Sequence, residues 1–161
     1  MEWQQVLREK LLPDSKIAVL GAGSILCGDD AAGMLLIEEL QARCMPENVL
    51  LLAGSTAPEN FTGLIKDFSP DLLILVDAAY IGREIGDIGI IESCDIKSAG
   101  FSTHMLPLNV MLEYLETTAG IESLVLGMQP GNVDFATEPS AAMQKSIQNL
   151  ANFISQLVNN Q

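Results

Sequence analysis

The sequence is poor in basic residues and in histidine. Eight Lys and Arg side chains stand against 21 Asp and Glu, the net charge is −13, and there is one histidine. A chain this acidic repels the phosphates of nucleic acids and the headgroups of anionic membranes, so we expect neither as a partner. The single histidine also restricts catalysis, because any serine or cysteine nucleophile would have to use it as its base.

Cysteine is scarce, and long apolar runs are missing. The three cysteines, Cys27, Cys44 and Cys94, are far apart and lack the CxxC spacing of zinc sites, which favours reduced thiols over disulfides. Apolar runs such as Leu72 to Val76 are much shorter than the roughly 20 residues of a membrane-spanning helix. The start of the chain has no charged n-region followed by an apolar h-region. We expect a cytoplasmic protein, and a monomer.

Length and hydrophobic pattern predict the fold class. The 161 residues, 48% of them hydrophobic, are enough for one domain and too few for two, so we expect a single domain over residues 1–161. Uninterrupted apolar runs are typical of strands covered by helices on both faces. The strands are expected at Ile17–Leu20, Val49–Leu52, Leu72–Val76, Ile88–Ile91 and Leu124–Leu126.

Helical spacing of apolar residues fills the intervals between these runs. Helices are expected at Asp30–Cys44, Glu59–Phe68 and Leu106–Thr118, and from near Pro139 to the end. Residues 1–15 form an N-terminal extension that we expect to be helical. The alternation predicts an α/β fold, a single three-layer α/β/α domain with a twisted, mostly parallel mixed sheet of about five strands. The strand at Ile88 should run antiparallel to the preceding one, because the connection is too short for a helical crossover.

The loop after the first strand favours a cation over a phosphate. Its glycines, Gly21 and Gly23, suggest a dinucleotide fingerprint, but Leu26 replaces the third glycine. The following helix opens on Asp29 and Asp30, so the protein places its own anions where a phosphate would bind. One of the two aspartates should cap the helix, and we assign that role to Asp29. Asp30 is then the candidate metal ligand.

Two further candidates are expected at the same edge of the sheet. Asp77 follows a central strand, and it converges with Asp30 if the first and third strands are neighbours. His104 precedes the third helix. An aspartate at a strand end is often a turn former, and a lone histidine is often structural. Together, two carboxylates and one imidazole form an incomplete shell for a divalent metal.

Other reactive side chains have structural interpretations. Cys27 lies beside the acidic loop but needs a nearby base to become a thiolate, so we expect a small buried hydrophobe. Several acidic residues fall on predicted turns and are expected to be solvated: Asp14, Glu84, Asp87 and Asp95.

Several ordered motifs together resemble the [NiFe]-hydrogenase maturation endopeptidases. They are Val19–Ser24 with Gly28-Asp29-Asp30, the strand end Val76-Asp77-Ala78, and Thr103–Asn109. Two further segments, Gly54–Asn60 and Leu126–Pro130, resemble the branch that serves hydrogenase 3, the formate hydrogenlyase type. The similarity extends from about Ile17 to the C-terminal helix. One departure is Ser24, where the family usually has asparagine, and its hydroxyl can still make a turn hydrogen bond.

The resemblance implies an aspartic-type endopeptidase that removes the C-terminal extension of a hydrogenase large-subunit precursor. It maps the nickel ligands onto Asp30, Asp77 and His104, with the two aspartates as the catalytic candidates. It also implies that Ni²⁺ is carried by the precursor, so that the free enzyme is metal-free. Two other hypotheses remain open: a metal-dependent amidase or peptidase with its own bound metal, and a non-catalytic nickel or maturation chaperone.

Overall fold

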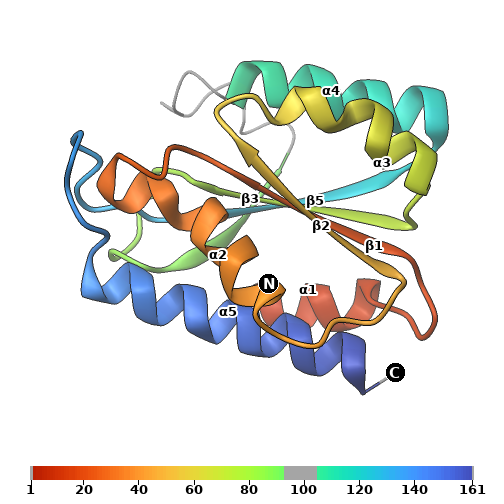
Figure 1. The fold of residues 1–161 in the computed structure, drawn as a ribbon, viewed down its shortest axis with the longest axis horizontal. Coiled ribbons are helices and arrows are strands. Elements are labelled where there is room, and N and C mark those ends of the chain that lie inside the picture. Colours follow the sequence, from red (N-terminus) through yellow and green to blue (C-terminus); the bar gives the residue numbers. More distant parts are fainter. Residues whose placement is uncertain (1, 93–104, 161) are drawn as a thin grey trace.

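A single five-stranded sheet forms the centre of the molecule. The structure is a computed structural model that describes residues 2–92 and 105–160. The strands lie in the order β2-β1-β3-β5-β4 (Figure 1). Strands β2, β1, β3 and β5 are parallel neighbours, and β4 is antiparallel to β5. This confirms the predicted mixed, mostly parallel sheet. The strand bounds are β1 Ile17–Ala22, β2 Val49–Ser55, β3 Leu72–Ala78, β4 Ile88–Ile91 and β5 Glu122–Met128.

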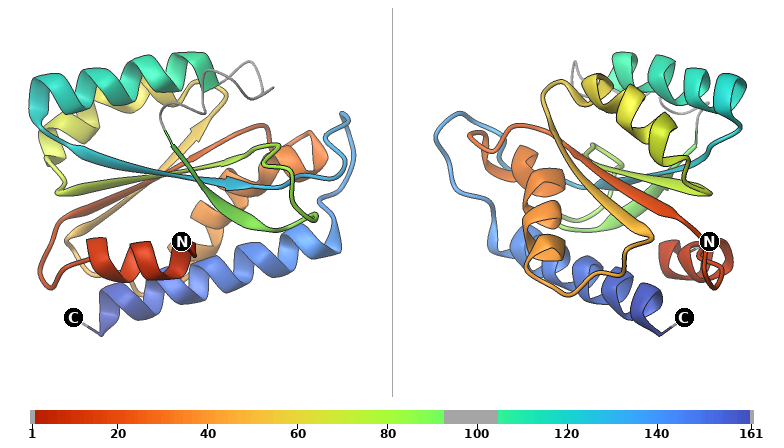
Figure 2. Two further views of the ribbon diagram at one scale, coloured as in Figure 1. Left: turned by 180° about the vertical axis from the view of Figure 1, so that it is seen from behind. Right: turned by 45° about the vertical axis from the view of Figure 1, so that its right-hand side comes forward.

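Helices cover both faces of the sheet, so the predicted three-layer α/β/α fold is confirmed. Figure 2 shows α1, α2 and α5 on one face and α3 and α4 on the other. No helix in the described ranges is long and apolar enough to cross a membrane. The helix bounds are α1 Trp3–Lys10, α2 Ala32–Gln41, α3 Thr62–Phe68, α4 Met105–Ala119 and α5 Ala141–Asn159, with short 3₁₀ turns η1 Gly28–Ala31 and η2 Pro58–Phe61.

Alternating residues of the central strands build two cores. Along β1, Ile17 and Val19 belong to the core beneath α1, α2 and α5, whereas Ala18 and Leu20 belong to the core beneath α3 and α4. Every residue of β1 and β3 is buried. This is why their sequences are apolar without interruption, since a strand covered on both faces has no side open to water.

Several predicted elements differ from the structure in their bounds, and one differs in its strand partner. Strand β5 extends beyond the apolar run at both ends, because the ladder with β3 continues through Glu122 and Gly127. The helix predicted from Asp30 to Cys44 begins instead as the tight turn η1 and ends at Gln41. Strand β4 has the predicted direction, but its partner is β5 rather than β3.

A pair of glycines brings α2 against the sheet at the carboxyl end of β1. A Cβ at Gly21 would lie 2.1 Å from the Gly33 carbonyl oxygen. A Cβ at Gly33 would lie 2.4 Å from the carbonyl oxygens of both Ala22 and Val76. Only glycine fits at such approaches of backbone to backbone. Gly33 therefore gives the close helix packing that the missing third glycine provides in dinucleotide-binding loops.

Candidate active site

The loop between β1 and α2 folds back so that the Asp30 carboxylate accepts a hydrogen bond from its start. The Ser24 N–H donates to Asp30 Oδ2 at 2.8 Å, and Asp30 is half-buried. Gly23 makes the turn with φ +118°, and a Cβ there would lie 2.0 Å from the Asp30 carbonyl oxygen. The Leu26 N–H donates to Ser24 Oγ at 3.3 Å, which confirms the turn hydrogen bond predicted for this serine.

Asp77 lies beside this loop, fully buried at the end of β3. Strands β1 and β3 are hydrogen-bonded neighbours, which confirms the condition for Asp30 and Asp77 to converge. Gly23 lies between them, since the position of a Cβ there is also 3.4 Å from Asp77 Oδ1. Asp77 Oδ1 accepts a hydrogen bond from the Ala78 N–H at 2.8 Å, and Oδ2 is buried without a hydrogen-bond partner among the described residues.

This environment makes the ionised form of Asp77 unfavourable. Burial, and to a lesser extent the negative charge of Asp30, raise the pKa of Asp77 from 3.8 to about 7. The hydrogen bond from the Ala78 N–H lowers the pKa and offsets part of this rise. A carboxyl with a pKa near neutrality can exchange a proton with a substrate or with water at physiological pH.

A cation is the ligand that this pair of carboxylates fits. Within residues 2–92 and 105–160, neither Asp30 nor Asp77 forms an ion pair with a lysine or arginine; the ion pairs there are Lys10 with Glu122 and Arg43 with Glu39. A buried carboxylate oxygen without a partner costs free energy that a bound cation would recover. The described residues contain no group of three or more candidate ligands, so this pair alone is an incomplete shell.

Asp29 does not cap its own helix, so that prediction was wrong. Its carboxylate is fully buried and turned away from η1. Oδ1 accepts from the Ser140 N–H at 2.6 Å, and Oδ2 accepts from the Gly131 N–H at 2.7 Å and from the Ser140 hydroxyl at 3.0 Å. Asp29 therefore ties the acidic loop to the start of α5. Of the two neighbouring aspartates, Asp29 is therefore structural, and Asp30 is the one that lies beside Asp77.

The remaining predicted residues have mixed outcomes. His104 lies outside the described residues, as do Cys94 and Asp95, and its role stays a prediction. Cys27 is half-buried rather than fully buried, because its segment lies at the surface beside Thr137. The turn residues Asp14, Glu84 and Asp87 are exposed, as predicted.

Gln129 is a structural residue of this region that sequence reasoning did not single out. It is 8% exposed and follows β5. Its Oε1 accepts from the Ile81 N–H at 2.9 Å and from the Arg83 N–H at 3.3 Å, which shapes the loop after β3. Its one sequence signal is a polar residue directly after a buried strand, a position where side chains often bond to neighbouring loops.

Comparisons with known proteins point to one family. The family model described as "Hydrogenase maturation protease" matches residues 34–157. The Hydrogenase 3 maturation protease of Escherichia coli K12 is 37% identical over 118 residues, which are 73% of this chain and 74% of that protein.

Solved structures agree. The crystal structure of the [NiFe] hydrogenase maturation protease HycI from Thermococcus kodakarensis KOD1 matches with a TM-score of 0.87 and 34% identity, over 96% of this chain and 99% of that one. A crystal structure of the Hydrogenase 3 maturation protease matches with a TM-score of 0.76 and 31% identity, over 86% and 88% of the two chains.

Proposed function

This chain belongs to the hydrogenase maturation protease family and is a hydrolase, and we propose that it removes the C-terminal extension of a [NiFe]-hydrogenase large-subunit precursor after nickel has been inserted. The nickel arrives with the precursor and is bound by Asp30, Asp77 and His104. The similarity to Hydrogenase 3 maturation proteases supports a hydrogenase of that type as the substrate.

The observation that carries this proposal is the partnerless oxygen of Asp77. It is buried, it lies in the same small site as the Asp30 carboxylate, and no basic side chain within the described ranges neutralises the pair. A divalent cation on the substrate offsets the burial and the neighbouring charge that raise the pKa of Asp77, because it attracts the ionised form of both carboxylates. The site is therefore complementary to a metal-loaded substrate.

Recognition through the metal makes the protease a checkpoint. Contacts to nickel are available only when the precursor has been loaded, so binding energy favours the mature form of the metal site. An unloaded precursor leaves two carboxylates facing each other in a poorly solvated site. In this proposal the same residues decide which substrate is cut and at which stage.

Asp77 also suits the proton transfers of peptide hydrolysis. A carboxylate near the scissile bond takes a proton from the attacking water, and the water oxygen bonds to the carbonyl carbon. The same carboxyl then returns the proton to the leaving amine as the C–N bond breaks. In the free protein burial raises the pKa of Asp77 to about 7, and a bound cation lowers it, so the carboxylate is ionised and able to take the proton once the metal-loaded substrate is in place. We propose Asp77 for this role, with Asp30 holding the substrate. The free cysteines Cys27 and Cys44 fit a cytoplasmic place of action.

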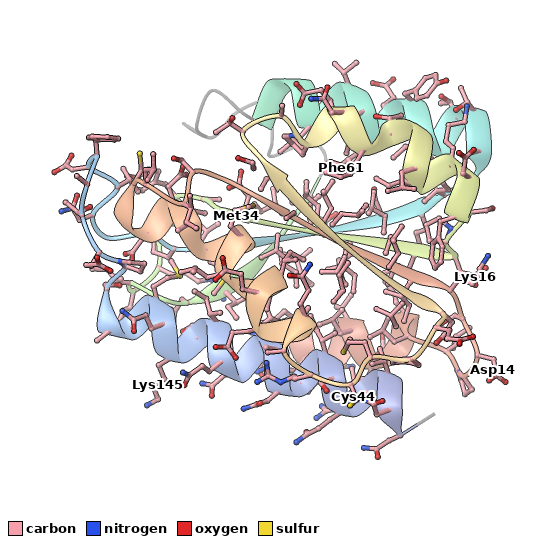
Figure 3. All side chains as sticks on the ribbon, in the orientation of Figure 1. Asp14, Lys16, Met34, Cys44, Phe61 and Lys145 are labelled. Atoms are coloured by element: carbon pink, nitrogen blue, oxygen red, sulfur yellow. The ribbon has the colours of Figure 1, made fainter. Side chains whose placement is uncertain are left out.

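The test is to incubate the purified protein with nickel-loaded precursor and to follow the precursor mass. Loss of the C-terminal extension is expected with the unaltered protein, and none with Asp30→Asn or His104→Ala. Asp14→Asn is a matched control, because Asp14 is exposed and far from α2, the helix that follows Asp30. The labels of Asp14 and of Met34 on α2 mark this separation in Figure 3. An unchanged precursor mass with the unaltered protein would support a non-catalytic chaperone and refute the protease.

Metal analysis separates the second alternative. Protein expressed without any hydrogenase precursor should contain well under one equivalent of nickel or zinc. A stoichiometric metal content would show that the protein has its own resident metal, and it would contradict the proposal that the nickel arrives with the precursor.

A further inference from the structure

Exposed apolar side chains gather on the loops that surround the aspartate pair. Among the described residues, nine large hydrophobic side chains are exposed. Five of these nine lie on three loops at the carboxyl edge of the sheet, and we name them the apolar rim: Ile25, Leu26, Tyr80, Ile85 and Phe135. Phe135 is the most exposed of the nine, at 73%. Single exposed apolar residues are ordinary on a protein surface, but a concentration beside a candidate site is not.

A hydrogen bond and an apolar contact join the three loops into one surface. The Ala136 N–H donates to the Leu26 carbonyl at 2.8 Å, which brings the segment of Phe135 beside that of Leu26. Ile85 packs against Gly131, where a Cβ would lie 2.8 Å from its Cδ1. The loops lie side by side at the left of Figure 1 and at the right in the reverse view of Figure 2.

The rim borders the candidate active site along the chain itself. Ile25 and Leu26 directly follow Ser24, whose N–H binds the Asp30 carboxylate. Tyr80 follows Asp77 by three residues. A macromolecule that places a metal ion against the two aspartates must therefore also face these side chains.

The charges on the same loops indicate what kind of surface binds there. Besides the aspartate pair, the loops carry four exposed carboxylates, Glu84, Asp87, Asp134 and Glu138, and one basic residue, Arg83. A second copy of this chain would bring like charges together, and an anionic membrane would be repelled in the same way. The complementary partner has an apolar centre flanked by lysine or arginine.

We propose that the apolar rim is a docking surface for the folded body of the protein substrate, separate from the contacts to its metal and scissile peptide. This inference rests on the proposed function, because the substrate is taken to be the large-subunit precursor. The precursor surface beside its metal site presents apolar side chains to the rim and basic side chains to the four carboxylates. Docking of this kind holds the C-terminal extension of the precursor in place while the aspartates bind the metal.

The experiment measures the binding of metal-free precursor, which the protease does not cut and which offers no metal to the aspartates. Leu26→Ser and Phe135→Ser should each raise the dissociation constant about tenfold, a loss of about 1.4 kcal/mol. Leu64→Ser is the matched control, because Leu64 is 48% exposed, close to the 58% of Leu26, and lies on α3, on the other side of Figure 1 from the three loops. It should change the dissociation constant less than twofold. Equal affinities in all variants would overturn the proposal.

Further measurements test the charges and the other occupants. Affinity should fall as salt is added, and Asp134→Asn with Glu138→Gln should reduce that salt dependence. A salt dependence that the double variant leaves unchanged would contradict the charge complementarity. If the protein self-associates and Phe135→Ser abolishes this, the rim binds a second copy of the chain. If it binds anionic vesicles and Phe135→Ser abolishes this, the rim binds a membrane. Either result would overturn the proposal. If nickel-loaded precursor is never cut but rim variants still bind metal-free precursor more weakly, the proposed function fails and the docking surface stands.

Discussion

At the scale of single residues, Asp77 lowers the stability of the folded protein. It is fully buried, its Oδ2 has no hydrogen-bond partner in the part of the chain that the structure describes, and its pKa is raised to about 7. A hydrophobic side chain would suit the position better if stability alone mattered. Proteins keep such groups where they bind or react, since the unfavourable free state is relieved by the ligand.

The raised pKa of Asp77 predicts a specific loss of stability with pH. Below pH 3.8 the carboxyl is protonated in both states, and between 3.8 and about 7 it ionises in the unfolded chain before the folded one. Stability is therefore lost as pH rises through this window. Between pH 5.5 and 7.5 the loss from this group is roughly 2 kcal/mol. Asp77→Asn should lack it.

The measurement is urea unfolding of both proteins at several pH values. Taking the difference between the two free energies of unfolding removes the effects of the titrating groups that do not interact with Asp77. The difference should change by roughly 2 kcal/mol over this range in favour of the asparagine variant. A constant difference would show that Asp77 titrates normally.

Asp29 should prove a structural residue despite its place beside Asp30. Its carboxylate accepts three hydrogen bonds from Gly131 and Ser140 in a buried site. Asp29→Ala leaves these donors unpaired, so we expect a loss of about 3 kcal/mol or more in the free energy of unfolding. Asp134→Ala, at an exposed position, should stay within about 0.5 kcal/mol. Denaturant unfolding of both variants measures this. An unchanged free energy of unfolding in Asp29→Ala would contradict a structural role for the hydrogen bonds of Asp29 to Gly131 and Ser140.

At the scale of elements, the contact between β1 and α2 determines where the site lies. Gly21 and Gly33 let two backbones approach until no Cβ fits, and this brings the start of α2 down onto the end of the sheet. Asp30, in the turn before α2, is thereby held near Asp77. The glycines thus contribute to the chemistry through geometry alone.

Replacing Gly21 with alanine should be severely destabilising. Its Cβ would lie 2.1 Å from the Gly33 carbonyl oxygen, a backbone atom that cannot rotate away. We expect a loss of about 3 kcal/mol or more. Gly63→Ala in α3 is the control, because nothing lies within 4 Å of a Cβ there and alanine favours a helix by about 1 kcal/mol. Thermal unfolding should therefore shift in opposite directions, and a tolerated Gly21→Ala would refute the close packing.

At the scale of the whole molecule, the net charge of −13 opposes folding. The described part of the chain has two ion pairs, so most carboxylates there are not paired with a basic side chain. Like charges repel more strongly in the compact state than in the unfolded chain. The same charge suits a partner with a basic surface and a metal cation.

Salt should therefore stabilise the fold. Raising NaCl from 10 to 300 mM shortens the screening length from roughly 30 Å to less than 10 Å. We expect the midpoint of thermal unfolding to rise by about 2–4 °C, corresponding to roughly 1 kcal/mol. Differential scanning calorimetry at pH 7.5 over a series of NaCl concentrations measures this. A falling midpoint would mean that the two ion pairs outweigh the repulsion.

The sequence by itself determined the layers of the fold and brought two candidate site residues to one edge of the sheet. The buried strands and the faces of the helices follow from local hydrophobic spacing, which is a property of the chain before it folds. Asp30 and Asp77 follow from strand ends, because parallel strands bring their carboxyl ends to one edge. Element limits were less predictable, as for η1 and β5, since they depend on hydrogen bonds to neighbouring segments.

Only the tertiary structure decided what Asp29 does, since the sequence had assigned it to capping the helix. Asp29 bonds to Gly131 and Ser140, more than 100 residues away, and no local pattern announces such partners. The same holds for Gln129 and for the apolar rim, whose three loops meet only when the sheet has formed. The physical reason is that these groups are satisfied by contacts between distant segments, and the order of the strands determines which segments meet.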